Sequence, residues 1–270
     1  MKSEVSNHHH RSISSIFKKK TLVFLRHGQA THNPRAEAEK EKGCSHETFM
    51  KLMQEDDQFD AELTPLGIEQ AMEGKKKYEH LLVGVDLVVS SPLSRALKTA
   101  DLTICPENGM PTSSCTSTSG IETSHPKRVC IESLREINGL LLNAKRRAKI
   151  DLEERFHERW NFDSLTEEDK TWTEKLEEYD DCSERGYQSL LWLLQRSEDK
   201  ILVVAHGGIL RFTMDLHPLV TVDNSNRFSN CEMRQYEITF DWKTDEEYDL
   251  FSNKRPLIIL TEVSADDRKD

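Results

Sequence analysis

The chain has 270 residues, of which 37 are Lys or Arg and 48 are Asp or Glu, so its formal net charge at pH 7 is −11. Hydrophobic residues make up 36% and charged residues 31% of the chain, which predicts long polar segments around the core. The acidic balance argues against nucleic acid as a partner, because a phosphate backbone is bound by clustered lysine and arginine.

The cysteines and the N-terminus indicate a protein of a reducing compartment. Six cysteines form neither a C-x-x-C pair nor a zinc-site spacing, so no metal is expected. No apolar stretch approaches 18 residues, and residues 1–20 lack the apolar region of a secretory signal. We therefore expect a flexible tail over 1–20, no membrane contact and a cytoplasmic location. A transit peptide is the alternative, because the segment is Ser-rich and basic, but it contains Glu4.

Three segments read as a strand followed by a short turn and a helix. Residues 21–25 (TLVFL) are a continuous apolar run that ends at Arg-His-Gly. Residues 85–89 (VDLVV) stop at Ser-Ser-Pro, where Pro92 can open a helix. Residues 201–205 (ILVVA) end at His-Gly-Gly before a third helical segment. This order predicts an α/β fold with a mostly parallel, doubly wound sheet.

Two helices and two further strands complete the predicted domain. Strands are expected at 232–240 and 256–263, joined by an acidic connection. A helix with a covered apolar face is indicated by Tyr187, Leu190, Leu191 and Leu194. A helix that opens at Thr64-Pro65 has its apolar residues at Leu66, Ile68, Ala71 and Met72.

Polar or charged segments interrupt this pattern. We interpret 34–60, 106–127 and 140–182 as insertions into one domain that spans 21–264, followed by a flexible tail over 265–270. Inside the last insertion, the run Lys145-Arg146-Arg147-Ala148-Lys149 is interpreted as a solvated helix face, with a contact to an anionic substrate as the alternative.

Several chemically versatile side chains directly follow the predicted strands. Arg26 and His27 follow the first strand, and His206 follows 201–205. Arg95 lies in the turn and helix after 85–89, and Glu136 follows the apolar run RVCIESL. Open α/β sheets bind ligands outside the carboxyl ends of their strands, so these side chains are expected to meet at one rim.

The order of these motifs resembles the histidine phosphatase superfamily, also called the phosphoglycerate mutase-like family. The resemblance is carried by RHGQATHN, LTPLGIEQA, SSPLSRALKTA, LREI and VVAHGG, and it extends from residue 21 to about 215. The stretch REINGLLLNAKRRAKIDLEERF further resembles a plant and fungal branch of that family. The resemblance implies a three-layer α/β sandwich and an enzyme that acts on a small phosphorylated substrate without a metal or other cofactor.

The resemblance also implies the role of each motif residue. His27 is expected to be neutral and to attack phosphorus, which gives a phosphohistidine intermediate. Glu136 is the expected proton donor and base, with Glu132 as the neighbouring alternative. His206 is expected to donate as a cation, and the remaining phosphate-binding groups are expected to be Arg26, Asn33, Arg95 and the backbone of Gly207.

The predicted activity is hydrolysis of a soluble phosphomonoester, with a phosphoglycerate mutase as the enzymatic alternative. Gln29, Ala30 and His32 depart from residues that are frequent in the family near the mouth of the site, and no second cationic clamp is evident in the sequence. A phosphoglycerate mutase needs such a clamp to retain a bisphosphate. Two further hypotheses stay open, namely a noncatalytic module that binds a phosphorylated ligand and a scaffold that uses the insertions for protein contacts.

Overall fold

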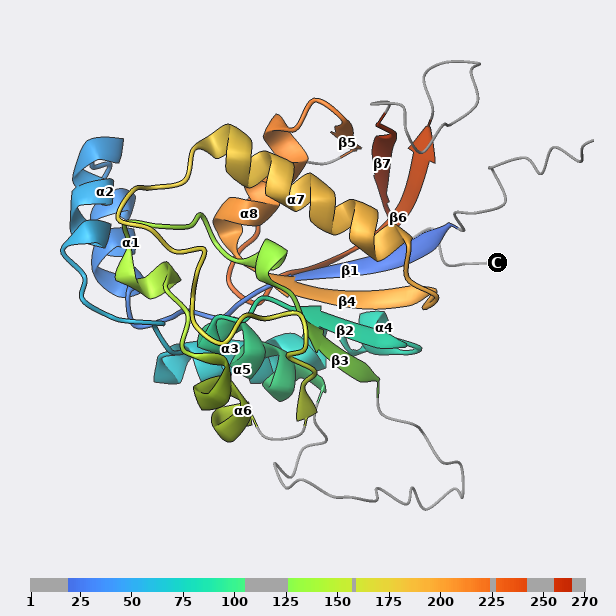
Figure 1. The fold of residues 1–270 in the computed structure, drawn as a ribbon, viewed down its shortest axis with the longest axis horizontal. Helices are drawn as coiled ribbons and strands as arrows, with labels where there is room; N and C mark the ends of the chain where they lie inside the picture. Colours follow the sequence, from blue (N-terminus) through green and yellow to red (C-terminus); the bar gives the residue numbers. More distant parts are fainter. Residues whose placement is uncertain (1–18, 105–125, 157–158, 224–226, 242–254, 264–270) are drawn as a thin grey trace, which may run out of the picture.

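The computed structural model describes residues 19–104, 126–156, 159–223, 227–241 and 255–263 (Figure 1). The tail predicted over 1–20 lies outside these residues except at its last two positions, and Lys20 already belongs to the first strand. The predicted insertion at 106–127, apart from its last two residues, and the predicted tail at 265–270 also lie outside them.

Within the described residues, seven strands form one sheet in the order β3-β2-β4-β1-β6-β7-β5. Strand β6 is antiparallel to both of its neighbours, and all other adjacent pairs are parallel. The mostly parallel α/β sheet is therefore confirmed. The strands are β1 (Lys20–Arg26), β2 (Leu87–Ser90), β3 (Lys127–Cys130), β4 (Lys200–Ala205), β5 (Val220–Val222), β6 (Met233–Asp241) and β7 (Leu257–Glu262).

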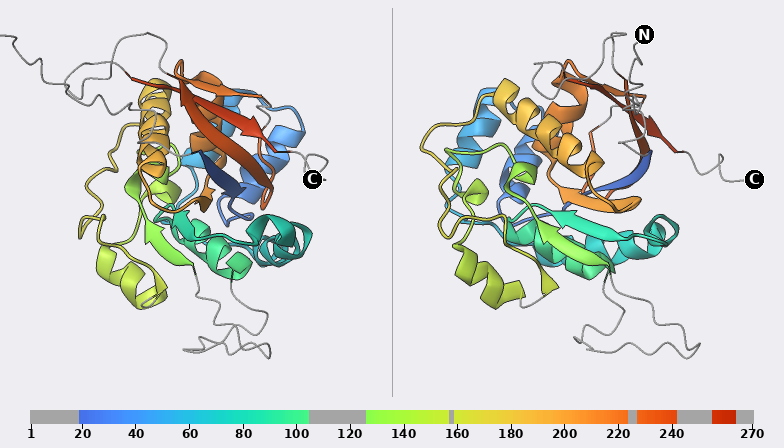
Figure 2. Two further views of the ribbon diagram at one scale, coloured as in Figure 1. Left: turned by 90° about the vertical axis from the view of Figure 1, so that its right-hand side faces the viewer. Right: turned by 45° about the vertical axis from the view of Figure 1, so that its right-hand side comes forward.

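Helices cover both faces of the sheet. Figures 1 and 2 show α7 (Tyr179–Leu194) and α8 (Gly207–Arg211) on one side, and α3 (Pro65–Lys77), α5 (Ser94–Ile104) and α6 (Lys149–Phe156) on the other. The predicted three-layer arrangement follows from this placement. The remaining helical elements are α1 (Asn33–Glu41), α2 (His46–Gln54), α4 (Glu79–Leu82), η2 (Glu132–Leu134), η3 (Leu142–Ala144) and η5 (Phe212–Leu216).

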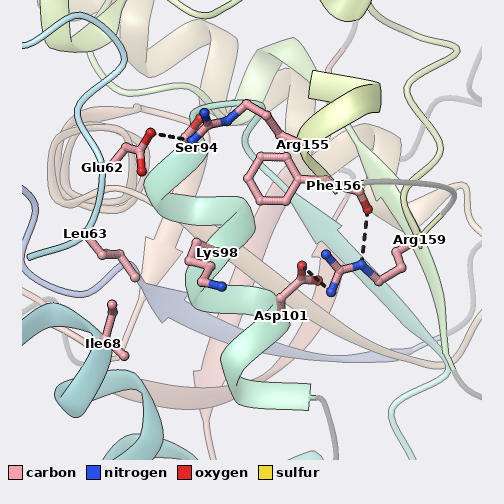
Figure 3. A pocket seen from close by; sticks show the side chains of 9 residues that line it. All are labelled: Glu62, Leu63, Ile68, Ser94, Lys98, Asp101, Arg155, Phe156 and Arg159. Atoms are coloured by element: carbon pink, nitrogen blue, oxygen red, sulfur yellow. Dashed lines mark hydrogen bonds and ion pairs between the residues drawn. The ribbon is translucent and has the colours of Figure 1, made fainter. Parts of the chain in front are cut away.

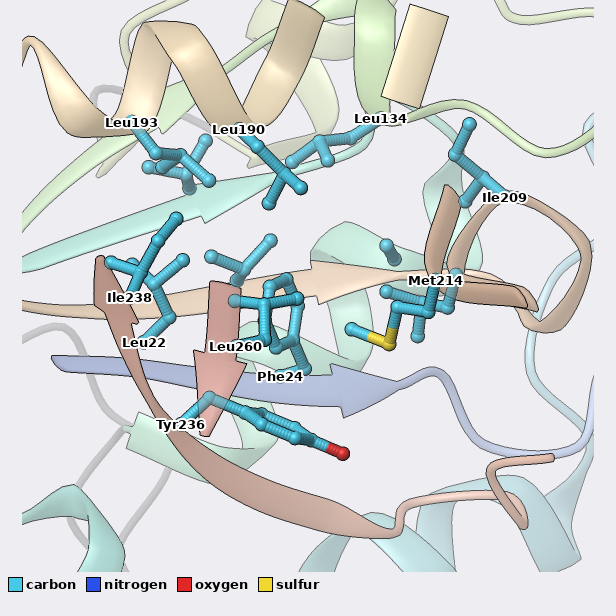
Figure 4. Close-up of a cluster of buried hydrophobic side chains, with 14 of the residues drawn as sticks. Leu22, Phe24, Leu134, Leu190, Leu193, Ile209, Met214, Tyr236, Ile238 and Leu260 are labelled. Atoms are coloured by element: carbon cyan, nitrogen blue, oxygen red, sulfur yellow. The ribbon is translucent and has the colours of Figure 1, made fainter. Parts of the chain in front are cut away.

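The core has two halves because β1 is buried on both faces. Leu22 and Phe24 pack in the cluster that includes Leu190 of α7 (Figure 4). Val23 and Leu25 point to the opposite face and pack in the cluster that includes Leu97 of α5. Successive side chains of a strand alternate between faces, so a strand covered on both sides is apolar throughout. This explains the continuous apolar run in the sequence.

The apolar face predicted for α3 is confirmed at Ala71, which is 1% exposed, and wrong at its three larger residues. Leu66, Ile68 and Met72 are 48%, 36% and 50% exposed, and the helix instead buries Gly67, Ala71 and Gly74. A methyl group at position 67 would overlap the backbone oxygen of Gln29. Helix α3 therefore approaches the loop after β1 so closely that small residues, rather than large apolar ones, form its inner face.

Buried arginines join the segment predicted as an insertion at 140–182 to the residues before it. Arg146 is 1% exposed, lies in a loop and donates from Nε to Glu132 at 2.7 Å, so the interpretation of its basic run as a solvated helix face is wrong for this residue. Arg135 is equally buried and pairs with Asp169 at 2.7 Å. Burial of a guanidinium is tolerated because carboxylates and carbonyls occupy its donors.

The segment predicted as an insertion at 34–60 contains α2 and all but the first residue of α1. None of the helices among the described residues is long and apolar enough to cross a membrane.

Candidate active site

His27 is buried at the end of β1, with 2% of its surface exposed. Its Nδ1 lies 2.6 Å from the backbone oxygen of Gly28. A carbonyl oxygen can only accept, so Nδ1 carries the hydrogen and the neutral ring keeps its lone pair on Nε2. Burial, followed by the charges of Arg95 and Arg26, holds the pKa of His27 well below its usual range. The ring is therefore neutral at pH 7, as a nucleophile requires.

The turn after His27 is shaped by a close crossing with α3. The N–H of Gly28 donates to Thr99 Oγ1 at 3.1 Å, and a Cβ at position 28 would lie 2.5 Å from the backbone oxygen of Gly67. No larger residue fits this crossing without moving the backbone. The two glycines thus set the position of the His27 loop.

His206 follows β4, the parallel neighbour of β1, and therefore lies next to His27. Their ring centroids are 4.8 Å apart and the ring planes are inclined by 60°. The Nε2 of His206 lies 2.7 Å from Ser91 Oγ, whereas its Nδ1 is buried with no partner among the described residues. Burial, then Arg95 and His27, hold the pKa of His206 well below its usual range, contrary to the cationic donor expected from the resemblance. A neutral His206 can still donate from Nδ1.

Arg95 lies in the first turn of α5, is fully buried and contacts the ring of His27. Its Nε donates to His27 Nε2 at 3.3 Å, and its Nη1 donates to the backbone oxygen of Asn143 at 2.7 Å. Its Nη2 is buried with no partner among the described residues. Burial lowers the pKa of Arg95 to about 10, opposed by the negative charges of Glu136 and Asp60. The guanidinium is therefore a cation at pH 7.

Arg26 presents a second unfilled donor at the end of β1. Its Nη1 donates to the backbone oxygen of Phe228 at 2.8 Å, and its Nη2 lies 3.5 Å from Glu37 Oε1 of α1. Its Nε is buried without a partner among the described residues, and a Cβ at Gly207 would lie 3.2 Å from this atom. The backbone of Gly207 and the guanidinium of Arg26 are thus neighbours.

Asn33 begins α1 and is 8% exposed. Its Oδ1 accepts from the backbone N–H of Ala30 at 2.9 Å, and its Nδ2 lies 3.2 Å from Nε2 of His32. The amide nitrogen has two hydrogens, so one of them is left for a ligand.

Glu136 belongs to the loop after η2, and its side chain contacts the first turn of α8. Its carboxylate accepts from the backbone N–H groups of Gly208 and Ile209, each at 3.0 Å, and from its neighbour Ile137 at 2.9 Å. The alternative carboxylate, Glu132, is instead bonded to the buried guanidinium groups of the 140–182 insertion and its neighbours. The structure therefore brings Glu136, rather than Glu132, to the backbone N–H groups of the first turn after His206.

Four residues of this region escaped prediction. Ser91 lies within the SSPLSRA motif, so its place in that motif could have suggested it. Asn143 holds Arg95, and Asp60 accepts from the backbone N–H of Ser94 at 2.9 Å, yet both belong to segments read as insertions. Arg185 donates to the backbone oxygens of Ser133, Arg135 and Glu136, and thereby fixes the loop that carries Glu136. Such contacts leave no local signal in a sequence.

The site combines a neutral imidazole with unfilled nitrogen donors. The buried donors without partners among the described residues include Arg26 Nε, Arg95 Nη2 and His206 Nδ1. Buried polar groups are normally paired, and several unpaired donors beside one nucleophile fit the oxygens of a tetrahedral anion. The residues described contain no group of three or more His, Cys, Asp or Glu that could hold a metal ion.

A separate cavity of about 350 Å³ lies beside α5 and α6 (Figure 3). Two of its arginines are already paired, Arg155 with Glu62 and Arg159 with Asp101. None of the predicted site residues lines it. The histidine pair, rather than this cavity, is therefore the candidate active site.

Comparison with known sequences supports the family resemblance that the motifs indicated. A model of the "Histidine phosphatase superfamily (branch 1)" matches residues 22–114 and 121–244. The chain is 31% identical over 240 residues to "Phosphoglycerate mutase-like protein 1" of Arabidopsis thaliana, with 81% of each chain covered. It is 30% identical over 262 residues to "Phosphoglycerate mutase-like protein 2" of the same plant, with 80% of this chain and 73% of the relative covered.

Solved structures resemble the fold at lower sequence identity. One is titled "Mycobacterial hydrolase 1", with 18% identity, a TM-score of 0.48, and coverage of 92% of this chain and 100% of the other. Another is a mycobacterial glucosyl-3-phosphoglycerate phosphatase, with 21% identity, a TM-score of 0.44, and coverage of 81% and 93%.

Proposed function

Because the chain belongs to branch 1 of the histidine phosphatase superfamily, we propose that it hydrolyses a small phosphate monoester through a phosphohistidine at His27. The observation that carries the proposal is the contact of 2.6 Å between His27 Nδ1 and the backbone oxygen of Gly28. This contact leaves the lone pair on Nε2, which faces Arg95 and lies close to His206. A neutral nucleophile surrounded by donors suits attack on a phosphoryl group.

In the first step, Nε2 of His27 attacks phosphorus while the ester P–O bond breaks. Arg26, Arg95 and His206 donate to the phosphoryl oxygens, where charge is concentrated in the transition state. Arg95 exchanges its bond to His27 for one to the phosphate. Glu136 accepts from three backbone N–H groups, so it must take up a proton when the substrate binds. The departing oxygen then takes that proton from Glu136, and the alcohol leaves as a neutral molecule.

In the second step, a water molecule attacks the phosphorus of phosphohistidine. Glu136 takes the proton from that water, the P–N bond breaks, and orthophosphate leaves. His27 regains its neutral ring and Glu136 regains its proton, so the site is ready for another cycle.

Substitution of His27 tests the proposal. Orthophosphate release from a panel of phosphate monoesters is measured for the wild type, for His27→Ala and for His80→Ala, which removes an exposed histidine of α4 as a control. We expect His27→Ala to lose about 10³-fold or more in kcat/KM and the control to retain full activity. Equal rates for the wild type and His27→Ala would overturn the proposal.

A second measurement separates hydrolysis from phosphoryl transfer. Two relatives are named phosphoglycerate mutase-like, and a mutase would use the same histidine. A coupled assay on phosphoglycerates compares isomerisation with orthophosphate release, and faster isomerisation would replace the hydrolase with a mutase. Trapping of an acid-labile phosphate on the wild type, absent from His27→Ala, identifies the intermediate.

The cytoplasmic location stays a prediction that imaging of a tagged chain can test.

A further inference from the structure

A third buried imidazole ends the loop between β1 and α1, the same loop that begins with His27. His32 is 5% exposed and occupies the N-cap position of α1. A side chain at that position ordinarily accepts a hydrogen bond from the first turn of its helix, but His32 makes no such bond. Its ring is therefore oriented by other contacts.

The tautomer of His32 follows from its neighbour. Asn33 Oδ1 accepts from the backbone N–H of Ala30 at 2.9 Å, which leaves Asn33 Nδ2 as the atom facing His32 Nε2 at 3.2 Å. An amide nitrogen donates, so His32 Nε2 accepts and is unprotonated. The neutral ring then carries its hydrogen on Nδ1. This Nδ1 is buried and has no partner among the described residues.

Burial and the charge of Arg95 lower the pKa of His32 as they lower the pKa of His27 and His206. Burial, followed by the positive charges of Arg95 and Arg26, holds the pKa of His32 well below its usual range. A charge on His32 would in turn lower the pKa of both His27 and His206. The neutral His32 ring can donate a hydrogen bond to an anion without adding a third positive charge to those of Arg95 and Arg26.

We propose that His32 is a substrate-binding residue whose Nδ1–H donates to an oxygen of the bound phosphate, with Asn33 as the residue that selects the tautomer. The inference rests on the proposed function for the chemical class of the ligand. It assigns a role to a position where this chain departs from residues frequent in the family. The N–H of His32 is buried and has no partner among the described residues, and the bound phosphate supplies one.

Two substitutions separate the two nitrogens of the ring. Asparagine at position 32 places an amide nitrogen near the position of Nδ1, whereas glutamine places its amide near Nε2 and leaves no donor at Nδ1. Orthophosphate is titrated calorimetrically into the full chain. We expect His32→Gln to weaken orthophosphate binding by about tenfold or more, because a hydrogen bond to a charged group is lost. His32→Asn is expected to stay within about threefold of the wild type, since it retains a donor.

A spectroscopic readout detects the contact itself. In nitrogen NMR of histidine-labelled wild-type chain, the His32 signals, assigned by their loss in His32→Asn, should show a protonated Nδ1 and an unprotonated Nε2. Addition of orthophosphate should shift the Nδ1–H signal. A role confined to packing would leave this signal unmoved. This measurement also decides the matter if the substitutions impair folding, which thermal unfolding without phosphate reveals.

The outcomes distinguish this inference from the proposed function. Equal orthophosphate affinity in His32→Gln and the wild type, with an unmoved Nδ1–H signal, overturns the role of His32 and leaves the hydrolase intact. Absence of orthophosphate binding by the wild type overturns the role as well. Binding that depends on His32, without turnover of any ester, supports the inference and removes the proposed hydrolysis.

Discussion

Arg95 donates a hydrogen bond of 3.3 Å from Nε to Nε2 of His27, the atom that the proposed reaction uses as its nucleophile. The same guanidinium is held by the backbone oxygen of Asn143 and keeps one nitrogen unpaired among the described residues. Arg95 therefore has two functions in the proposed cycle. Before the phosphate binds, it donates to the lone pair of His27 Nε2. After the phosphate binds, it donates to a phosphate oxygen.

Removal of the Arg95 charge should alter both rate and pH dependence. Arg95→Gln should reduce kcat/KM by about 10²-fold or more, because planar donors to the phosphoryl oxygens are lost. After burial, Arg95 is the main cause that lowers the pKa of His27, so the pKa should rise in the variant. Protonated His27 cannot attack, and the acidic limb of the kcat/KM profile should move to higher pH. Lys98→Gln, an exposed position on the same helix, should leave that limb unchanged.

Ser91 should matter for activity through His206. Its Oγ lies 2.7 Å from His206 Nε2, so Ser91→Ala removes the contact that fixes the ring and its tautomer. We expect kcat/KM to fall by about tenfold. The free energy of unfolding should also fall by about 1–3 kcal/mol, because His206 and the N–H of Leu93 lose a buried partner. Ser90→Ala is the matched control, because Ser90 is equally buried but donates to the backbone oxygen of Ser91. A similar loss in both variants would contradict a specific role for Ser91.

Asp60 should make stability depend on pH in a defined direction. Burial raises the pKa of its carboxyl to about 6, opposed by hydrogen bonds from Ser94 and by the charges of Arg95 and Arg147. The folded state then holds this proton more tightly than the unfolded state. The contribution of protonated Asp60 to the free energy of unfolding is therefore largest at low pH and is lost as pH rises through about 6.

The variant Asp60→Asn isolates this contribution, because the histidines titrate in both proteins. Between pH 5 and pH 7.5, the unfolding free energy of the wild type should fall by about 1.4 kcal/mol relative to the variant. Urea unfolding at several pH values measures the difference. A difference that is constant with pH would show that Asp60 has the same pKa in both states.

Gly67 should couple folding to activity. Because a methyl group there would overlap the backbone oxygen of Gln29, Gly67→Ala must displace either α3 or the loop that carries His27. We expect a loss of about 1–3 kcal/mol in the free energy of unfolding, together with reduced kcat/KM. Met72→Ala, at a position of the same helix that is 50% exposed, should change the free energy of unfolding by about 0.5 kcal/mol or less. Equal effects of the two substitutions would contradict the close crossing.

The sequence predicted the central strands β1, β2 and β4 because they are covered on both faces, whereas the short strand β5 was not predicted. A buried parallel strand must be apolar along its whole length, so the runs near Val23, Val88 and Val203 were recognisable without tertiary information. The same reasoning failed on α3, where the covering partner is a backbone loop. Close approach of two backbones selects glycine and alanine, and periodicity of large apolar residues does not report it.

The chain order alone determined which chemistry was available: an Arg-His-Gly after one strand, a His-Gly-Gly after another, and an arginine and a glutamate between them. Tertiary structure decided which atoms of these residues lie together. Three features depend on contacts between residues brought together by folding or on the conformation of a turn. They are the hydrogen on His27 Nδ1, the contacts of Glu136 with α8, and the Nδ1 of His32, which has no partner in the described part of the chain. Tautomers and unpaired donors are properties of a neighbourhood in space, and a sequence specifies them only through its fold.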